Sequence, residues 1–425
     1  MIHRLYWFRH DLRLHDNPGL QAAAAGADRL TLVYCHDARR LEPTPWGFVR
    51  GSQHQHAFLC STLTDLGQRL AAAGNGLLET AGLPGVEIAR IAAAVGAHEI
   101  HCEALPAPYE MADVRQLQAA GYTVVQHWQS SLIHPEDAPF TIDRLPRMYT
   151  YFRNAIEDAG VEPRPPIPAP ASLPPPATSR PDVALPPAIP SHPWNRRSSF
   201  PYQLPAFQGG ETAALAHMAQ YFERGLAQSY DKTRNQLFGL DYSSKFSPWL
   251  ALGALSPRTL YRALRDAEHR MGATEGTRSL WSELMWRDFF RYLHLRHGRR
   301  LYAASGIGHR PAPSHDPVTF QAWCQGTTGQ PLIDAGMREL RVTGFLSNRL
   351  RQVVASYLVN ELNDDWRAGA AWFEACLVDF DIFSNQGNWL AAAGRGPDAR
   401  GRKFNPEKQS RDHDRQGTYR ALWGT

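Results

Sequence analysis

A proline-rich segment in the middle of the chain is the feature that most constrains the fold. Residues 161–206 contain closely spaced prolines, among them Pro163, Pro165, Pro166, Pro168, Pro170, Pro174, Pro175 and Pro176. Proline lacks a backbone N–H and fixes its own φ, so this segment favours extended, polyproline-like backbone and excludes a helix or a central strand. We interpret the segment as an ordered to semi-rigid linker between two domains, with a disordered segment as the alternative.

Strand-like and helical patterns alternate before this segment. Short apolar runs rich in β-branched and aromatic residues predict strands at residues 3–8, 29–35, 98–102 and 122–128. Helical spacing of apolar residues predicts helices at residues 17–25, 54–73 and 88–95. Strands that alternate with helices form βαβ units, so we expect an α/β, Rossmann-like domain with a parallel sheet over residues 1–135.

Only helical patterns follow the proline-rich segment. They cover residues 212–222, 257–270, 278–295, 317–325, 334–343, 349–362 and 370–378. No strand-like run of comparable quality accompanies them. We therefore predict an all-α domain over residues 208–425, joined to the first domain by a linker over residues 136–207.

Composition narrows the class of protein. With 425 residues, 43% hydrophobic and 20% charged, the chain fits a globular enzyme of two or three domains. No apolar window is long enough to span a membrane. The five cysteines form no CxxC pair, which argues against an iron–sulfur cluster, a zinc ribbon or a disulfide framework. We predict a cytoplasmic protein without a metal.

Charge is distributed unevenly along the chain. Residues 1–200 contain 17 basic and 19 acidic residues, whereas residues 201–425 contain 28 basic and 22 acidic residues. A polyanionic partner would therefore bind the C-terminal half. A solvated basic face is the alternative interpretation.

Polar groups stand within an apolar stretch near the C-terminus. Asp379 and Asp381 are followed by Asn385 and Trp389, with Trp366 upstream. Buried carboxylates are costly unless they are hydrogen-bonded, and a large cofactor with several N–H and O–H groups would supply those bonds. A helix end with stray acidic residues is the alternative.

Two further groups of residues have spacings that suggest binding. Glu283 and Trp286 are three residues apart and so share one face of a predicted helix, although an amphipathic helix with a core tryptophan has the same pattern. Consecutive hydroxyls at Ser243, Ser244 and Ser247 precede a helix and could donate to an anion. An ordinary helix cap is the alternative there.

Several strings in the chain resemble the DNA photolyase/cryptochrome family. They are WFRHDLRLHDNPGL at 7–20, YDKTRN at 230–235, YSSKFSPWLALG at 242–253, WSELMWRDFFR at 281–291, TGFLSNRLRQ at 343–352 and RKFNP at 402–406. The resemblance extends along the whole chain and includes its domain order. Within the family, the sequence is most similar to the cryptochrome DASH group.

The resemblance implies non-covalently bound FAD in the helical domain. Residues that match the family's pyrophosphate-holding segment are Tyr230, Ser243, Ser244, Lys245, Phe246 and Ser247. Polar residues that match those around the flavin are Arg287, Asn348 and Arg351. Asp379 and Asp381 match the acidic pair that faces flavin and ribose, and Asn385 matches the residue opposite flavin N5.

The resemblance also implies a reaction. Glu283 and Trp286 match residues that contact damaged pyrimidines, and with Asn385 they form the expected catalytic set. The expected function is blue-light-driven repair of cyclobutane pyrimidine dimers, preferentially in single-stranded DNA. The damaged bases are expected to be flipped out of the DNA, and the protein is expected to be a monomer. A blue-light photoreceptor with weak or no repair activity is the second hypothesis. An FAD-free nucleotide-binding protein, which would be colourless, is the third.

The chain departs from the family at two positions. Trp389 and Trp366 match the first two members of the electron-transfer chain that reduces the flavin, but the third tryptophan is absent near Pro313. Trp323, Trp372 or a tyrosine are candidate replacements. Ala391 stands where relatives have an aromatic wall of the substrate pocket. Both losses favour the photoreceptor hypothesis.

An antenna chromophore is also expected from the resemblance. Glu110 lies about where some relatives have an acidic residue that holds the pterin of 5,10-methenyltetrahydrofolate. An empty cleft and a flavin antenna are the alternatives.

Overall fold

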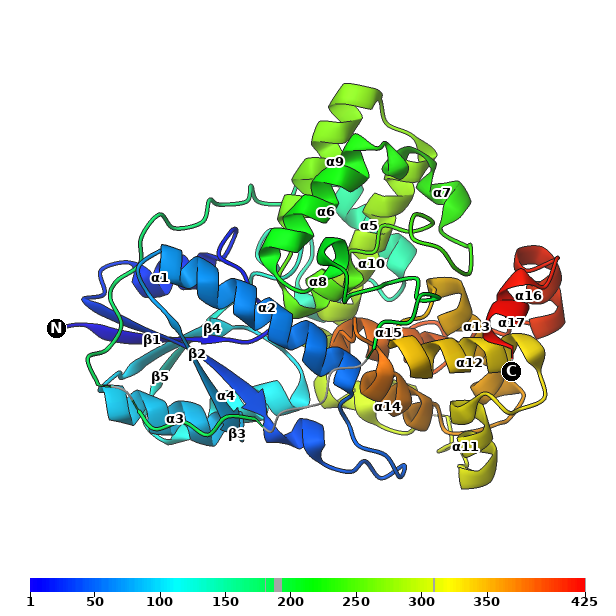
Figure 1. The fold of residues 1–425 in the computed structure, drawn as a ribbon, viewed down its shortest axis with the longest axis horizontal. Coiled ribbons are helices and arrows are strands. Elements are labelled where there is room, and N and C mark those ends of the chain that lie inside the picture. The colour runs from blue at the N-terminus through cyan, green and yellow to red at the C-terminus, as the bar shows by residue number, and fades with distance from the viewer. Residues whose placement is uncertain (180, 187–192, 309, 425) are drawn as a thin grey trace.

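The computed structural model describes residues 1–425 except 180, 187–192, 309 and 425 (Figure 1). The first part of the chain forms a five-stranded parallel sheet in the order β3-β2-β1-β4-β5. The strands are β1 His3–Phe8, β2 Arg29–Asp37, β3 Leu77–Gly82, β4 Glu99–Glu103 and β5 Thr123–His127. The predicted α/β domain with a parallel sheet is confirmed. The sequence analysis missed β3, a half-buried edge strand with one β-branched residue.

Helices cover both faces of the sheet (Figure 1). They are α1 Pro18–Ala24, α2 Gln53–Ala72, α3 Pro84–Val95 and α4 Pro108–Ala119. On β1, Tyr6 and Phe8 pack into the core beneath α1 and α2, whereas Leu5 and Trp7 pack into the core beneath α3 and α4. Successive side chains of a strand point to opposite faces, so one apolar run supplies two cores.

The proline-rich segment follows the surface of the α/β domain where it is described (Figure 1). Leu173 N donates to Ala73 O at 2.8 Å, and Ala81 N donates to Ala184 O at 2.7 Å. Leu30 N donates to Pro175 O at 3.1 Å. These backbone bonds tie the extended segment to the domain that precedes it.

The chain after residue 207 is helical, as predicted, whereas α5 Tyr149–Asp158 lies within residues 136–207, which were interpreted as a linker. The helices after residue 207 are α6 Glu211–Glu223, α7 Tyr230–Thr233, α8 Ser247–Leu252, α9 Pro257–Met271, α10 Glu275–His297, α11 Pro317–Gln325, α12 Pro331–Thr343, α13 Asn348–Asn360, α14 Trp366–Cys376, α15 Ile382–Ala392, α16 Pro406–His413 and α17 Thr418–Trp423. Within the described residues, no strand follows β5. The long helix α10 packs against α5, α7, α9 and α15 and forms the centre of this domain.

Buried polar bonds join the two domains. Arg258 donates to both carboxylate oxygens of Asp16, at 2.9 and 2.7 Å, and both side chains are almost fully buried. Asp288 accepts from the backbone N–H groups of Leu132 and Ile133, each at 2.9 Å. A buried charge must be paired to be tolerated, so these contacts specify how the domains meet.

Candidate functional site: two adjoining cavities

A small cavity lies in the helical domain between α13, the turn after α14, and α15. Its volume is about 90 Å³. The structure brings together on its wall five residues predicted to hold the flavin, namely Asn348, Arg351, Asp379, Asp381 and Asn385. Trp389 also lines this cavity.

Asp379, in the turn between α14 and α15, accepts hydrogen bonds from side chains of α13 and α8. Arg351 on α13 donates to both of its carboxylate oxygens, at 3.0 and 2.9 Å. Ser247, the first residue of α8, donates from Oγ to Asp379 at 2.6 Å. This hydrogen bond connects the predicted pyrophosphate-binding segment, which includes Ser247, to the wall of the small cavity.

Asp381 caps the N-terminus of α15. It accepts from the backbone N–H of Ser384 at 2.7 Å and pairs with Arg291 at 3.2 Å. Burial opposes its ionisation, but the positive charges of Arg291 and Arg287 outweigh burial and lower the pKa of Asp381 to about 2. The carboxylate is therefore charged at neutral pH.

Lys245 in the pyrophosphate segment has an unusual environment. Its φ of 58° is left-handed, and its side chain is buried. Nζ lies 3.5 Å from the ring centroid of Tyr242 and 5.0 Å from that of Phe345, without a hydrogen-bond partner among the described residues. Burial lowers the pKa of Lys245 well below its usual value. An unpartnered buried amine fits an anionic ligand group such as a phosphate.

The remaining predicted cofactor residues lie outside the small cavity. Those that do not line it are Tyr230, Ser243, Ser244, Lys245, Phe246, Ser247 and Arg287. The ring of Phe246 packs on Tyr221 at 5.1 Å in the core. Arg287 donates to the carbonyl oxygens of Ser130 and Leu250 at the domain joint. Their side chains are already engaged, so these two are weaker candidates for direct contact with a ligand.

Glu283 and Trp286 share one face of α10, as their spacing predicts. Arg234 donates to Glu283 at 2.5 Å, and Trp286 stacks on Tyr149 with ring centroids 3.7 Å apart. Burial raises the pKa of Glu283, and the charges of Arg234 and Arg402 oppose that shift. Arg402, which lines the small cavity, lies 5.9 Å from the Trp286 ring. Arg402 thus connects this face of α10 to the cavity.

The two predicted electron-transfer tryptophans are both buried. Trp389 packs so closely on Gly369 of α14 that a Cβ there would lie 2.2 Å from its ring. Gly369 lies three residues after Trp366 on α14, so the Trp389 ring packs about one helical turn away from the backbone of Trp366. Trp366 lines the large cavity described next, whereas Trp389 lines the small one.

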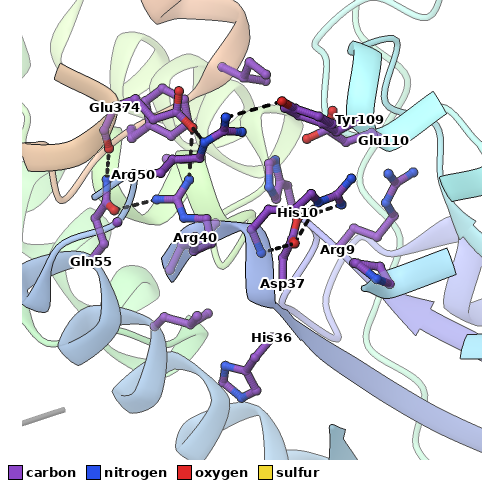
Figure 2. Close-up of a pocket in the computed structure, with 18 of the residues that line it drawn as sticks. Arg9, His10, His36, Asp37, Arg40, Arg50, Gln55, Tyr109, Glu110 and Glu374 are labelled. Atoms are coloured by element: carbon purple, nitrogen blue, oxygen red, sulfur yellow. Dashed lines mark hydrogen bonds and ion pairs between the residues drawn. The ribbon is translucent and has the colours of Figure 1, made fainter. Parts of the chain in front are cut away.

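A large cavity of about 960 Å³ lies between the domains (Figure 2). Its charged wall residues include Arg9, Arg39, Arg40, Arg50, Asp37, Glu110, Asp113 and Glu374. Figure 2 shows Arg50 bonded to Tyr109 and Arg40 bonded to Gln55 and Glu374. Phe380 and Asn385 line both cavities, so the two lie against one another. Asn385 is fixed on this shared wall because its Nδ2 donates to Ala370 O at 3.0 Å.

Glu110 faces the large cavity with an unsatisfied carboxylate oxygen (Figure 2). Its Oε2 is buried and has no hydrogen-bond partner among the described residues. Burial raises the pKa of Glu110, and the charge of Arg9 opposes that shift. A ligand with N–H donors would satisfy this carboxylate.

Two family models match the chain. A DNA photolyase model matches residues 4–171, and a model of the FAD binding domain of DNA photolyase matches residues 279–424. The cryptochrome DASH of Synechocystis is 44% identical over 99% of this chain and 86% of its own length. This chain belongs to the DNA photolyase/cryptochrome family.

Solved structures of the family have the same fold. The Synechocystis cryptochrome matches with a TM-score of 0.94 and 42% identity, covering 100% of this chain and 89% of that one. A class III photolyase from Agrobacterium tumefaciens matches with a TM-score of 0.78 and 29% identity, covering 100% and 86%. Cryptochrome DASH from Xenopus laevis is 41% identical over 98% of this chain and 81% of its own length. The DASH group is therefore the part of the family that this chain resembles.

As a family member, the chain has FAD as its cofactor, and its residues fit that group. Asp379 and Asp381 can accept from ribose and flavin donors, and Lys245 can pair with a phosphate. Among the described residues, no cluster of His, Cys, Asp or Glu could hold a metal ion. No described helix is long and apolar enough to cross a membrane.

Several site residues were not predicted from the sequence. Arg291 lies one helical turn after Arg287, inside a string quoted for the family resemblance, and its spacing could have indicated it. Arg402 also lies inside a quoted string, RKFNP, but no spacing relates it or Tyr149 to Trp286, because both contact that ring from distant parts of the chain.

Proposed function

We propose that this chain repairs cyclobutane pyrimidine dimers under blue light, preferentially in single-stranded DNA. The proposal rests mainly on the position of Glu283 and Trp286 beside the small cavity, to which Arg402 connects them and which we propose as the FAD site. The net positive charge of the C-terminal half supports an anionic partner at this face.

Each residue of this face has a proposed role in binding the lesion. Tyr149 stacks on Trp286 and holds that ring, so a flipped pyrimidine can stack on it. Arg234 pairs with Glu283 and holds its side chain in position, and the carboxylate would accept a hydrogen bond from the imide N–H of a thymine. Bound, reduced FAD supplies the light-driven electron that opens the dimer. Asn385, on the shared wall, is proposed to face flavin N5.

The repair assay uses FAD-loaded, chemically reduced protein and a dimer-containing single-stranded oligonucleotide. We expect the base absorbance to recover under blue light, with no recovery in the dark, and slower recovery on duplex DNA. Glu283→Ala should lower the rate, whereas the exposed control Glu275→Ala on the same helix should not. If reduced, FAD-loaded protein shows no recovery in light, the repair proposal is wrong.

A blue-light photoreceptor with weak or no repair activity is the second candidate. Ala391 favours it, because relatives have an aromatic wall there and a stacking ring contributes about 1–3 kcal/mol per base. The absence of a tryptophan near Pro313 favours it as well. Light-dependent spectral changes without dimer repair would support this candidate.

We further propose that the large cavity holds an antenna chromophore at Glu110. The unsatisfied carboxylate suits the N–H groups of a pterin, as in 5,10-methenyltetrahydrofolate. A flavin is the alternative, since a photolyase of Sulfolobus tokodaii, 26% identical with a TM-score of 0.76, is described with two FAD molecules and a light-harvesting role. Co-purified chromophores identified by mass spectrometry would distinguish the two.

We also propose that the protein is a monomer and that it is located in the cytoplasm. All five cysteines are free thiols, as expected in a reducing compartment. Two plant relatives are named as chloroplastic/mitochondrial, so fractionation of the native source is the relevant test.

A further inference from the structure

Trp46 lies at the tip of a tight turn from the α/β domain. Thr44 N donates to Phe48 O at 2.7 Å, and Gly47 N donates to Thr44 O at 3.2 Å. Gly47 has a φ of 87°, which L side chains rarely adopt, so the turn requires glycine there. The turn has a fixed shape and presents Trp46 half-buried against the helical domain.

The Trp46 ring contacts the two segments that flank the gap in the tryptophan chain. Its centroid lies 4.8 Å from that of His315, two residues after Pro313. The guanidinium of Arg367, the residue after Trp366, lies 5.9 Å from the same ring. Trp46 therefore lies beside the place where the third tryptophan is missing, although it belongs to the other domain.

A row of aromatic rings also connects Trp46 with Trp389. Ring centroids are 6.3 Å apart for Trp389 and Trp323, 5.9 Å for Trp323 and Phe320, and 5.4 Å for Phe320 and His315. The last step is the contact between His315 and Trp46. Trp46 thus contacts Arg367, the sequence neighbour of Trp366, and is linked to Trp389 through this row.

Burial distinguishes Trp46 from the inner tryptophans. Trp389, Trp366 and Trp323 are 2%, 1% and 0% exposed. The indole N–H of Trp323 donates to Val354 O at 3.1 Å, so it cannot easily pass its proton to water. A half-buried indole can release a proton to solvent, which prevents the electron from returning.

We propose that Trp46 is the terminal electron donor in flavin photoreduction. The proposal rests on the proposed FAD-dependent function and on the entry of electrons through Trp389 that the family resemblance implies. One electron leaves Trp46 for an oxidised Trp366 or Trp323 and restores it, and bound FAD is the final electron acceptor. The Trp46 radical cation then releases its indole proton to water, and an added thiol returns one electron and one proton.

Trp372 is the rival donor. Its ring contacts Phe48 at 5.0 Å, close to the same row of aromatic rings. However, its Nε1 is buried and has no hydrogen-bond partner among the described residues, so its proton has no acceptor. Trp46 therefore satisfies the requirement for proton release better than Trp372 does.

The test compares FAD-loaded variants under blue light with an added thiol. Trp46→Phe should lose most of the long-lived tryptophan radical in transient absorption and most of the steady-state bleaching of the flavin. Trp194→Phe is the matched control, because Trp194 is 43% exposed and lies in the linker; it should behave as wild type. Adding Pro313→Trp to Trp46→Phe should restore the radical, which a merely structural role for Trp46 would not allow.

Three outcomes separate this inference from the proposed function. If Trp389→Phe blocks photoreduction but Trp46→Phe does not, Trp46 is not the donor and entry through Trp389 stands. If loss appears in Trp372→Phe instead, the rival donor is correct. If Trp389→Phe reduces at the wild-type rate, electrons enter elsewhere and the Trp46 proposal falls, whereas repair by chemically reduced protein still tests the proposed function separately.

A measurement on the unaltered protein covers the case in which Trp46→Phe folds poorly. Prolonged illumination in air should leave oxidation products at the tryptophan that holds the radical. Peptide mapping by mass spectrometry should then find them at Trp46. Oxidation confined to Trp372 or other tryptophans would contradict the proposal.

Discussion

The two cavities adjoin at Asn385 and Phe380, and their walls differ in one buried carboxylate oxygen. In the small cavity each carboxylate already has an arginine, Asp379 with Arg351 and Asp381 with Arg291. In the large cavity Asp37, Asp113 and Glu374 also pair with arginines, but Oε2 of Glu110 has no hydrogen-bond partner among the described residues.

The difference indicates two modes of binding. Paired charges on helices of one domain form a rigid site, because each side chain is held by the next. An unsatisfied carboxylate at a domain interface can accept hydrogen bonds from the N–H groups of a ligand, which is why we propose the antenna there. The small cavity is thus held by its own ion pairs, whereas the large cavity leaves one carboxylate oxygen for a ligand.

The largest expected effect is on stability and comes from breaking the Asp381–Arg291 ion pair at the small cavity. Asp381→Ala leaves Arg291, 1% exposed, without its carboxylate and removes the cap of α15. Breaking a buried pair costs about 3–5 kcal/mol, so the urea-unfolding free energy should fall by that amount. As a control, Asp398→Ala in the exposed pair with Arg400 should leave the unfolding midpoint nearly unchanged. Equal effects in both variants would mean that the Asp381 pair is not structural.

In the large cavity we expect a loss of binding without a loss of stability. Glu110→Gln replaces the charged acceptor, and a charge-assisted hydrogen bond contributes about 1.5–3 kcal/mol. The affinity for added 5,10-methenyltetrahydrofolate should fall roughly 10- to 100-fold, as measured by fluorescence titration, while FAD content stays constant. Glu42→Gln, an exposed carboxylate, is the matched control. Unchanged affinity would remove Glu110 from the antenna site.

The contrast between the cavities also shows what the sequence could predict. Asp379, Asp381 and Asn385 stand within one turn and helix, so local spacing groups them without a structure. The parallel sheet followed from apolar runs that are buried on both faces. Family resemblance added the roles of Glu283 and Trp286, which spacing left open.

Contacts between distant segments could not be predicted. Trp46 and His315 come from different domains, and no periodicity relates them. The left-handed backbone of Lys245 was equally hidden, because such a conformation in a non-glycine residue is stabilised by its surroundings. Residue spacing predicts which side chains share a face of a single helix or strand. The large cavity is lined by residues of several helices, strands and loops, so spacing could not predict it.

Asp381 and Glu110 should change the free energy of unfolding in opposite directions as the pH is varied through the acidic range. The folded pKa of Asp381, about 2, lies below its ordinary value of 3.8, so its charge stabilises the fold above that value and this contribution is lost as pH falls towards 2. The loss amounts to about 2 kcal/mol, and Asp381→Asn should remove it. Glu110 has a raised pKa, so its contribution is lost as pH rises above 4.5. Unfolding free energies of wild type, Asp381→Asn and Glu110→Gln across acidic pH would test both signs, and parallel curves would contradict them.

The smallest expected effect lies at the wall that the cavities share. Asn385→Asp replaces the Nδ2 donor to Ala370 O with an oxygen, so the stability should fall by only about 1 kcal/mol. The added carboxyl should nevertheless change which redox form of the bound flavin persists under blue light, read from the visible spectrum. Asn360→Asp on α13 is the matched control, because its Nδ2 also donates to a backbone carbonyl, Ser356 O, and the residue lines neither cavity. If both variants have the wild-type spectrum after illumination, Asn385 does not face flavin N5, and the shared wall has no part in the photochemistry.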